Sequence, residues 1–116
     1  MDSKDIEVRT KRMIVKSLRH LSDRREQERL WLSAGGEVYS FVEAYCGLFD
    51  DTGLGDELER GPTWLGAAAD EALRRLDAQL SLVDNSLSPE QVIASVEMDR
   101  VRELAAVALR LVQPDA

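Results

Sequence analysis

The chain has 116 residues, a formal net charge of −7 at pH 7, 44% hydrophobic residues and 32% charged residues. This length and apolar fraction suit one folded domain, residues 1–116, and exclude a disordered polymer. The single cysteine excludes an internal disulfide, and the chain lacks a run of about 18 apolar residues that could span a membrane.

The first residues, MDSKDIEVRTKR, are charged and contain no apolar stretch like that of a signal peptide, so we expect a cytoplasmic protein without membrane contact. From Ser3 to Leu21 the sequence predicts an amphipathic helix. Its apolar side comprises Ile6, Thr10, Met13, Ile14, Leu18 and Leu21. Its other side carries a basic stripe, formed by Arg9, Arg12, Lys16 and Arg19. A strand starting at Ile6 is the alternative, because Val8 and Val15 lie off the apolar side.

The next two segments also predict helices. Asp23 can serve the first turn of a second helix, or the first helix continues with a bend near Ser22; Gly35-Gly36 ends the helix in both cases. A third helix follows, because apolar residues recur at helical spacing over residues 38–49. These residues are Val38, Phe41, Val42, Tyr45, Leu48 and Phe49. Cys46 lies in this helix and is expected to be a packed, unreactive thiol.

The acidic segment FDDTGLGDELERG predicts a hydrated connector with a single helical turn near its end. A helix from Thr63 to Asn85 follows, with aspartates at seven-residue intervals, among them Asp70 and Asp77.

The two tryptophans, Trp31 and Trp64, border helix ends. Both are expected to anchor the core, and Trp64 is also a candidate for a contact surface.

The last segment carries the most specific local signal, a capping box in which Ser88 precedes Pro89 and Gln91. It predicts one helix from Ser88 to Val112. Apolar residues in its second half cover an arc of about 160°, which suggests burial on two sides, by the core and by a second copy. We therefore expect a homodimer through the helix near residues 98–112. The whole chain predicts an all-α, compact, bundle-like domain of four to five helices.

No set of residues assembles into an active site, so we expect no catalytic residues, no cofactor and no metal centre. The acidic connector does not match a calcium loop, since the third and fifth positions counted from Asp50 are Thr52 and Leu54. One cysteine and one histidine cannot supply a zinc site. His20 borders the basic stripe and is expected to be a solvated surface side chain.

The charge is unevenly distributed along the chain. Residues 1–33 carry nine basic and six acidic side chains, a charge of +3, whereas residues 34–116 carry six and sixteen, a charge of −10. An acidic body attracts a basic partner and repels nucleic acid. The basic stripe could contact phosphates, but DNA-recognition domains usually have a pI above about 9, and this chain has a pI near 4.7. We therefore favour a protein partner over nucleic acid.

These observations favour a non-enzymatic protein–protein interaction module with a basic protein partner. In size and composition the chain is similar to immunity proteins, antitoxins and small regulatory proteins that neutralise a basic partner, although no motif links it to a named family. The partner-binding candidates are acidic residues and one aromatic anchor: Asp50, Asp51, Asp56, Glu57, Trp64, Asp70 and Asp77. Two alternatives stay open. One is a metal-binding or small-ligand-binding protein, or an enzyme, that uses carboxylates of residues 50–59; the other is a nucleic-acid-binding module that uses the basic stripe.

Overall fold

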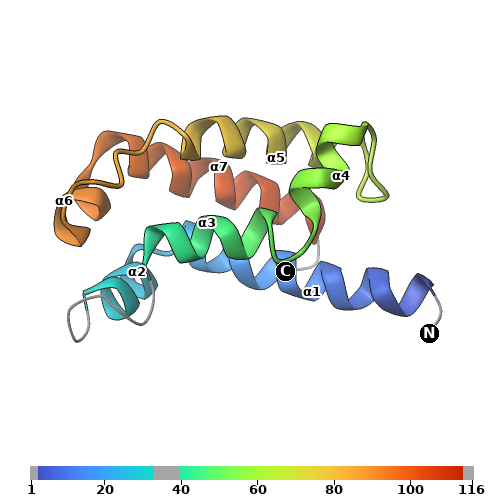
Figure 1. Cartoon of the computed structure of the whole chain (residues 1–116), viewed down its shortest axis with the longest axis horizontal. Coiled ribbons are helices and arrows are strands. Elements are labelled where there is room, and N and C mark those ends of the chain that lie inside the picture. Colours follow the sequence, from blue (N-terminus) through green and yellow to red (C-terminus); the bar gives the residue numbers. More distant parts are fainter. Residues whose placement is uncertain (1–2, 33–39, 114–116) are drawn as a thin grey trace.

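The computed structural model describes residues 3–32 and 40–113, and the regular structure within these ranges is helical (Figure 1). The predicted all-α class is confirmed for this part of the chain. In place of the expected four to five helices, the described residues form seven: α1 (Ser3–Ser22), α2 (Arg24–Trp31), α3 (Phe41–Phe49), α4 (Leu54–Arg60), α5 (Ala67–Leu80), α6 (Pro89–Ala94) and α7 (Val96–Val112). None of these described helices is long and apolar enough to cross a membrane.

Helix α7 lies at the centre of the molecule, with α1 and α5 as its main neighbours (Figure 1). Helix α3 packs on α1 and contacts α4, while α6 contacts both α2 and α7. One cluster of buried apolar side chains fills the space between the helices. The first turns of α1 extend beyond this cluster, toward the end of the molecule that carries α4 (Figure 1).

The two neighbours of α7 explain the wide apolar arc of the last helix. Helix α7 buries Met98, Val101, Ala105, Ala108 and Val112. Its fully buried alanines leave room for close helix packing, so α1 and α5 can cover the arc from two sides. Helices of the same chain therefore cover most of the wide apolar side of α7 that suggests a homodimer. Partly exposed apolar residues remain only at the edges of this side.

Polar caps create two helix breaks. The backbone of Ser95 is extended, with φ −70° and ψ 152°, and its hydroxyl accepts a hydrogen bond from the N–H of Met98 at 3.1 Å. Ser95 therefore ends α6 and starts α7 inside the single helix predicted for residues 88–112. The carboxylate of Asp23 likewise accepts two backbone N–H bonds from the first turn of α2. The prediction of a separate second helix is confirmed, and the alternative of one continuous helix bent near Ser22 is wrong.

Other helix boundaries also differ from the expected ones. The helix predicted from Thr63 to Asn85 is shorter, because Gly66 has a φ of 102°, outside helical geometry, and the helix ends at Leu80. The acidic connector forms α4, which is longer than the expected single turn. The predicted helix end at Gly35-Gly36 and the predicted helix start at Val38 lie outside the described residues.

Helix α1 confirms the helical alternative for the first segment and corrects its sides. Ile14 and Leu18 are buried as predicted, but Ile6 is 51% exposed, and Val15, expected off the apolar side, is buried. The reason is the position of α1. Its buried residues begin at Ile14, where it meets its neighbours, while its first turns extend past them (Figure 1). The strand alternative is wrong.

A buried polar network joins α1, α2 and α7, and it corrects the prediction of a solvated His20. His20 is 8% exposed, and its Nε2 accepts a hydrogen bond from the indole N–H of Trp31 at 3.0 Å. The buried Gln27 donates to the carbonyls of His20 and Leu21 and accepts from the guanidinium of Arg102 at 2.8 Å. The two carbonyls belong to the last turn of α1, where carbonyls have no N–H partner within the helix. The amide of Gln27 supplies a donor to both.

Candidate functional site

The acidic segment after α3 is built on a short amphipathic helix. Gly53 has a φ of +76°, the left-handed conformation that favours glycine, and it starts α4. Leu54 and Leu58 lie one turn apart, are buried and anchor α4 to the core. The exposed residues of α4 include three carboxylates: Asp56, Glu57 and Glu59. Helix α4 thus presents negative charge to solvent, much of it in the first turn, where the helix dipole favours it.

A groove of about 270 Å³ lies between α4 and the first half of α1, and we call it the acidic groove. The buried Ile14 lines it together with two apolar side chains that are about half exposed, Ile6 and Trp64. Trp64 is 41% exposed, so it is not the core anchor that was one of its two expected roles. Glu7 of α1 and Glu57 of α4 add carboxylates to the lining.

The turn that carries Trp64 is held by two side chains of α5. Asp70 accepts hydrogen bonds from the backbone N–H of Thr63 at 2.8 Å and from the hydroxyl of the same residue. Arg74 donates to the carbonyls of Leu58 and Gly61 at 3.0 and 3.1 Å. These bonds fix the turn to α5 and to the end of α4. The indole is therefore exposed on a braced turn.

Two of the predicted partner-binding aspartates make internal contacts. Asp70 is 2% exposed and has almost no surface to offer a partner. Asp77 is half-buried and accepts a hydrogen bond from the hydroxyl of Tyr45, which links α5 to α3. Burial, followed by this hydrogen bond and the charge of Asp77, raises the pKa of Tyr45 to about 12, so the phenol remains a donor at neutral pH.

Asp50 and Asp51 are exposed at the carboxyl end of α3, where the helix dipole disfavours negative charge. Their backbone N–H groups both bond to the carbonyl of Cys46, at 2.9 and 3.0 Å. Burial, then the hydrogen bond to Asp50 and the nearby carboxylates, raises the pKa of the Cys46 thiol. A protonated thiol is a poor nucleophile, which agrees with the expected unreactive cysteine.

The structure brings together only part of the predicted set and adds two residues. Glu57 and Trp64 meet in the acidic groove, whereas Asp50 and Asp51 lie outside its lining. Ile6 and Glu7 of α1 also line it. No local pattern in the sequence could identify these two, because their role depends on how far α1 extends past its neighbours.

The side chains that could support catalysis or metal binding are not gathered at this site. Within the described part of the chain, no group of three or more His, Cys, Asp or Glu side chains lies close enough to hold a metal ion. His20 accepts from Trp31, and burial lowers the pKa of its imidazole. The acidic groove instead combines apolar surface with carboxylates, which suits non-covalent binding.

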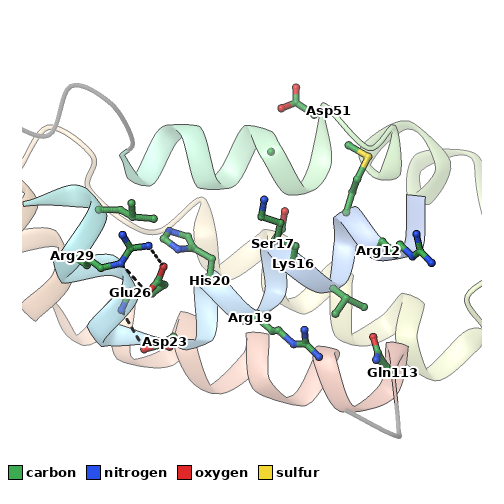
Figure 2. Close-up of a pocket in the computed structure, with 14 residues that line it drawn as sticks. Arg12, Lys16, Ser17, Arg19, His20, Asp23, Glu26, Arg29, Asp51 and Gln113 are labelled. Atoms are coloured by element: carbon green, nitrogen blue, oxygen red, sulfur yellow. Dashed lines mark hydrogen bonds and ion pairs between the residues drawn. The ribbon is translucent and has the colours of Figure 1, made fainter. Parts of the chain in front are cut away.

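The basic stripe lines a second, larger depression, which we call the basic trough. Arg12, Lys16 and Arg19 line this open trough of about 970 Å³ along α1, whereas Arg9 is not part of its lining (Figure 2). Helix α2 lies at one end. Asp51, after α3, and Gln113, after α7, lie on opposite sides of α1 (Figure 2).

No family model, curated protein or solved structure matches the chain. The acidic groove and the basic trough are therefore the features from which we infer a function.

Proposed function

We propose that the protein is a non-enzymatic binding module that captures a basic protein partner at the acidic groove. The observation that carries this proposal is the exposed indole of Trp64 on a braced turn, beside the exposed Ile6. Tryptophan is among the residues most enriched at the energetic centres of protein interfaces. Covering Trp64 and Ile6 would remove apolar surface from water, and each deeply buried side chain of this size contributes about 1.5–3 kcal/mol.

The carboxylates around the groove determine the sign of the partner. Glu7 and Glu57 line it, and Asp56 and Glu59 lie on the same short helix as Glu57. Such a cluster attracts a positively charged surface over several ångströms and speeds its approach, while the indole of Trp64, once the partner covers it, slows dissociation. An acidic immunity-like, antitoxin-like or regulatory role in the cytoplasm is the form of this function that the composition favours.

No specific observation favours a metal-binding function for residues 50–59. The carboxylates of α4 are exposed to solvent along one helix and do not converge on a common point. A nucleic-acid function would place a polyanion against a chain whose residues 34–116 carry a charge of −10. Self-association through α7 stays a proposal that depends on Val107 and Leu111, the partly exposed apolar residues in its second half.

The test begins with the tagged wild-type chain and Trp64→Ala used in parallel to capture proteins from the native cells. A partner retained by the wild type and lost by Trp64→Ala is then purified for kinetic binding measurements. We expect Trp64→Ala to weaken binding by about tenfold or more, mainly through faster dissociation. The triple variant E7Q/D56N/E57Q should slow association and reduce its dependence on salt.

The matched control is E71Q/E97Q/E103Q, which removes three exposed carboxylates outside the groove. It changes the net charge by the same amount and should alter association much less. Equal effects of the two triple variants would mean that net charge, and not the acidic groove, governs binding. An unchanged association rate for E7Q/D56N/E57Q at low salt would contradict the proposed function.

A further inference from the structure

The basic trough is a second surface that the proposed function does not use. Its lining contains four basic side chains and three acidic ones: Arg12, Lys16, Arg19, Arg29, Asp23, Glu26 and Asp51. Glu26 forms an ion pair with Arg29 (Figure 2), and the carboxylate of Asp23 accepts the backbone N–H bonds of α2. Those three charged side chains are therefore already engaged.

The remaining charges of the trough are strongly unbalanced. Among the ion pairs of the described residues, none involves Arg12, Lys16 or Arg19. All three project from α1, and the single remaining carboxylate of the lining, Asp51, follows α3 and lies apart from them (Figure 2). The trough thus presents unneutralised positive charge on a molecule whose net charge is −7.

The spacing of these charges matches a helical partner. Steps of four and three residues along α1 place Arg12, Lys16 and Arg19 on one face, over about 10.5 Å of helix axis. Carboxylates at the same spacing on a facing helix would lie opposite them. The trough is open along α1 past these three residues, so a facing helix has access to them.

Apolar side chains in the trough distinguish it from a purely ionic surface. Met13 is 40% exposed within the lining and the partly buried Leu30 also lines it, whereas Val15 is 5% exposed and belongs to the core. Gly47 of α3 lines it as well and adds no side chain. An unbranched methionine adapts to differently shaped apolar partners, as at other helix-binding surfaces.

We infer that the basic trough binds an acidic amphipathic helix of a second protein, with the partner's carboxylates on Arg12, Lys16 and Arg19 and its apolar stripe on Met13. Because α1 lines both depressions, the molecule would hold a basic partner and an acidic partner on two surfaces of the same helix. The positive charge of the trough extends over only about two helical turns, so it can contact few phosphates of duplex DNA.

The probe is a fluorescent, helix-forming peptide of about 20 residues, with Glu at three positions spaced four and three residues apart and Leu on the adjacent face. A control peptide has Gln in place of each Glu. Fluorescence anisotropy at low salt should show the Glu peptide binding at least tenfold more tightly than the Gln peptide. R12E/K16E/R19E should lose at least tenfold in affinity for the Glu peptide, and R12Q/K16Q/R19Q should lose a smaller amount. Circular dichroism verifies that each variant is folded.

The matched control, R25E/R60E/R110E, reverses three exposed arginines outside the trough and should change affinity less than threefold. Trp64→Ala should bind the peptide like the wild type, which separates this site from the acidic groove. Three results would overturn the inference: no preference for the Glu peptide, equal losses in the two charge-reversal triples, or tighter binding of a 20-base-pair duplex than of the peptide.

Discussion

Gln27 joins three helices through one buried amide. We expect Gln27→Leu to lower the free energy of unfolding by about 2–4 kcal/mol, because the carbonyl of Leu21 and one N–H of Arg102 lose the amide as their partner inside the protein, whereas the carbonyl of His20 keeps the backbone N–H of Asp23. Urea unfolding followed by circular dichroism measures the change. Glu103→Gln, which breaks an exposed ion pair with Arg100, is the control and should cost less than about 1 kcal/mol. An equally small loss for Gln27→Leu would mean that water or a rearranged side chain replaces the amide.

His20 is the single histidine of the chain, and it makes the free energy of unfolding depend on pH near and below pH 6.5. Burial lowers the pKa of His20 below 6.5, although Glu26 and Asp23 oppose this shift. The unfolded chain therefore binds a proton near pH 6.5 that the folded protein binds only at lower pH. Stability contributed by the neutral imidazole is complete above pH 6.5 and is lost as the pH falls, with a slope of at most about 1.4 kcal/mol per pH unit.

The measurement is a series of urea midpoints between pH 7.5 and pH 5 for the wild type and for His20→Gln. Glutamine keeps an oxygen that can accept from the indole of Trp31 and does not titrate. The wild type should lose more stability than His20→Gln across this range. Parallel curves for the two proteins would show that protonation of His20 is not coupled to unfolding.

His20 and Gln27 also show what the spacing of apolar residues cannot predict. Ile14 and Leu18 could be assigned to the core because their burial depends on a repeating pattern within one helix. The burial of His20 depends on an indole 11 residues away, and that of Gln27 on a guanidinium 75 residues away. Polar side chains enter a core when a distant partner satisfies them, and a local pattern carries no information about that partner.

At the scale of helices, α3 and α4 place the same kind of residue in opposite electrostatic settings. Asp51 follows the carboxyl end of α3, and Asp56 lies in the first turn of α4. We expect Asp51→Asn to raise the free energy of unfolding by about 0.3–1 kcal/mol and Asp56→Asn to lower it by a similar amount, because the helix dipoles act with opposite sign. Thermal and urea unfolding at low salt measure both. Changes of the same sign would show that overall charge repulsion outweighs the dipoles.

The helix boundaries that could be predicted are those set by neighbours in sequence. The capping box is confirmed, with Ser88 and Gln91 exchanging hydrogen bonds of 3.1 and 3.2 Å three residues apart. The break at Ser95 could not be predicted, because a serine among apolar residues also fits a helix interior. Arg102 donates to the carbonyl of Ile93 at 2.9 Å, so a residue of the next helix stabilises the end of α6.

At the scale of the whole molecule, the remaining question is self-association. The homodimer proposal requires a mass of twice 13.0 kDa at micromolar concentration, falling to 13.0 kDa in V107E/L111E. Multi-angle light scattering measures both. A control variant, V42E, changes an exposed apolar residue on α3 and should leave a dimer through α7 intact. A mass of 13.0 kDa for the wild type would end the proposal, since α1 and α5 already cover most of the apolar arc.

The candidate surfaces show the same division between local and distant information. The basic stripe was predictable because its members lie on one helix, and three of the four line the basic trough. The acidic groove was predictable only in part. Glu57 and Trp64 come from one stretch of sequence, whereas Ile6 and Glu7 reach them only because α1 passes beside α4 in the folded chain.

The two tryptophans occupy opposite environments, and this gives the molecule two optical reporters. Trp31 is 1% exposed and bonds to His20, whereas Trp64 stands in solvent at the acidic groove. A water-soluble cationic quencher such as caesium should reach the indole of Trp64 beside the carboxylates of the groove and leave that of Trp31 emitting. Occupation of the groove would then shift the emission of one fluorophore to shorter wavelength, while the other records only whether the chain is folded.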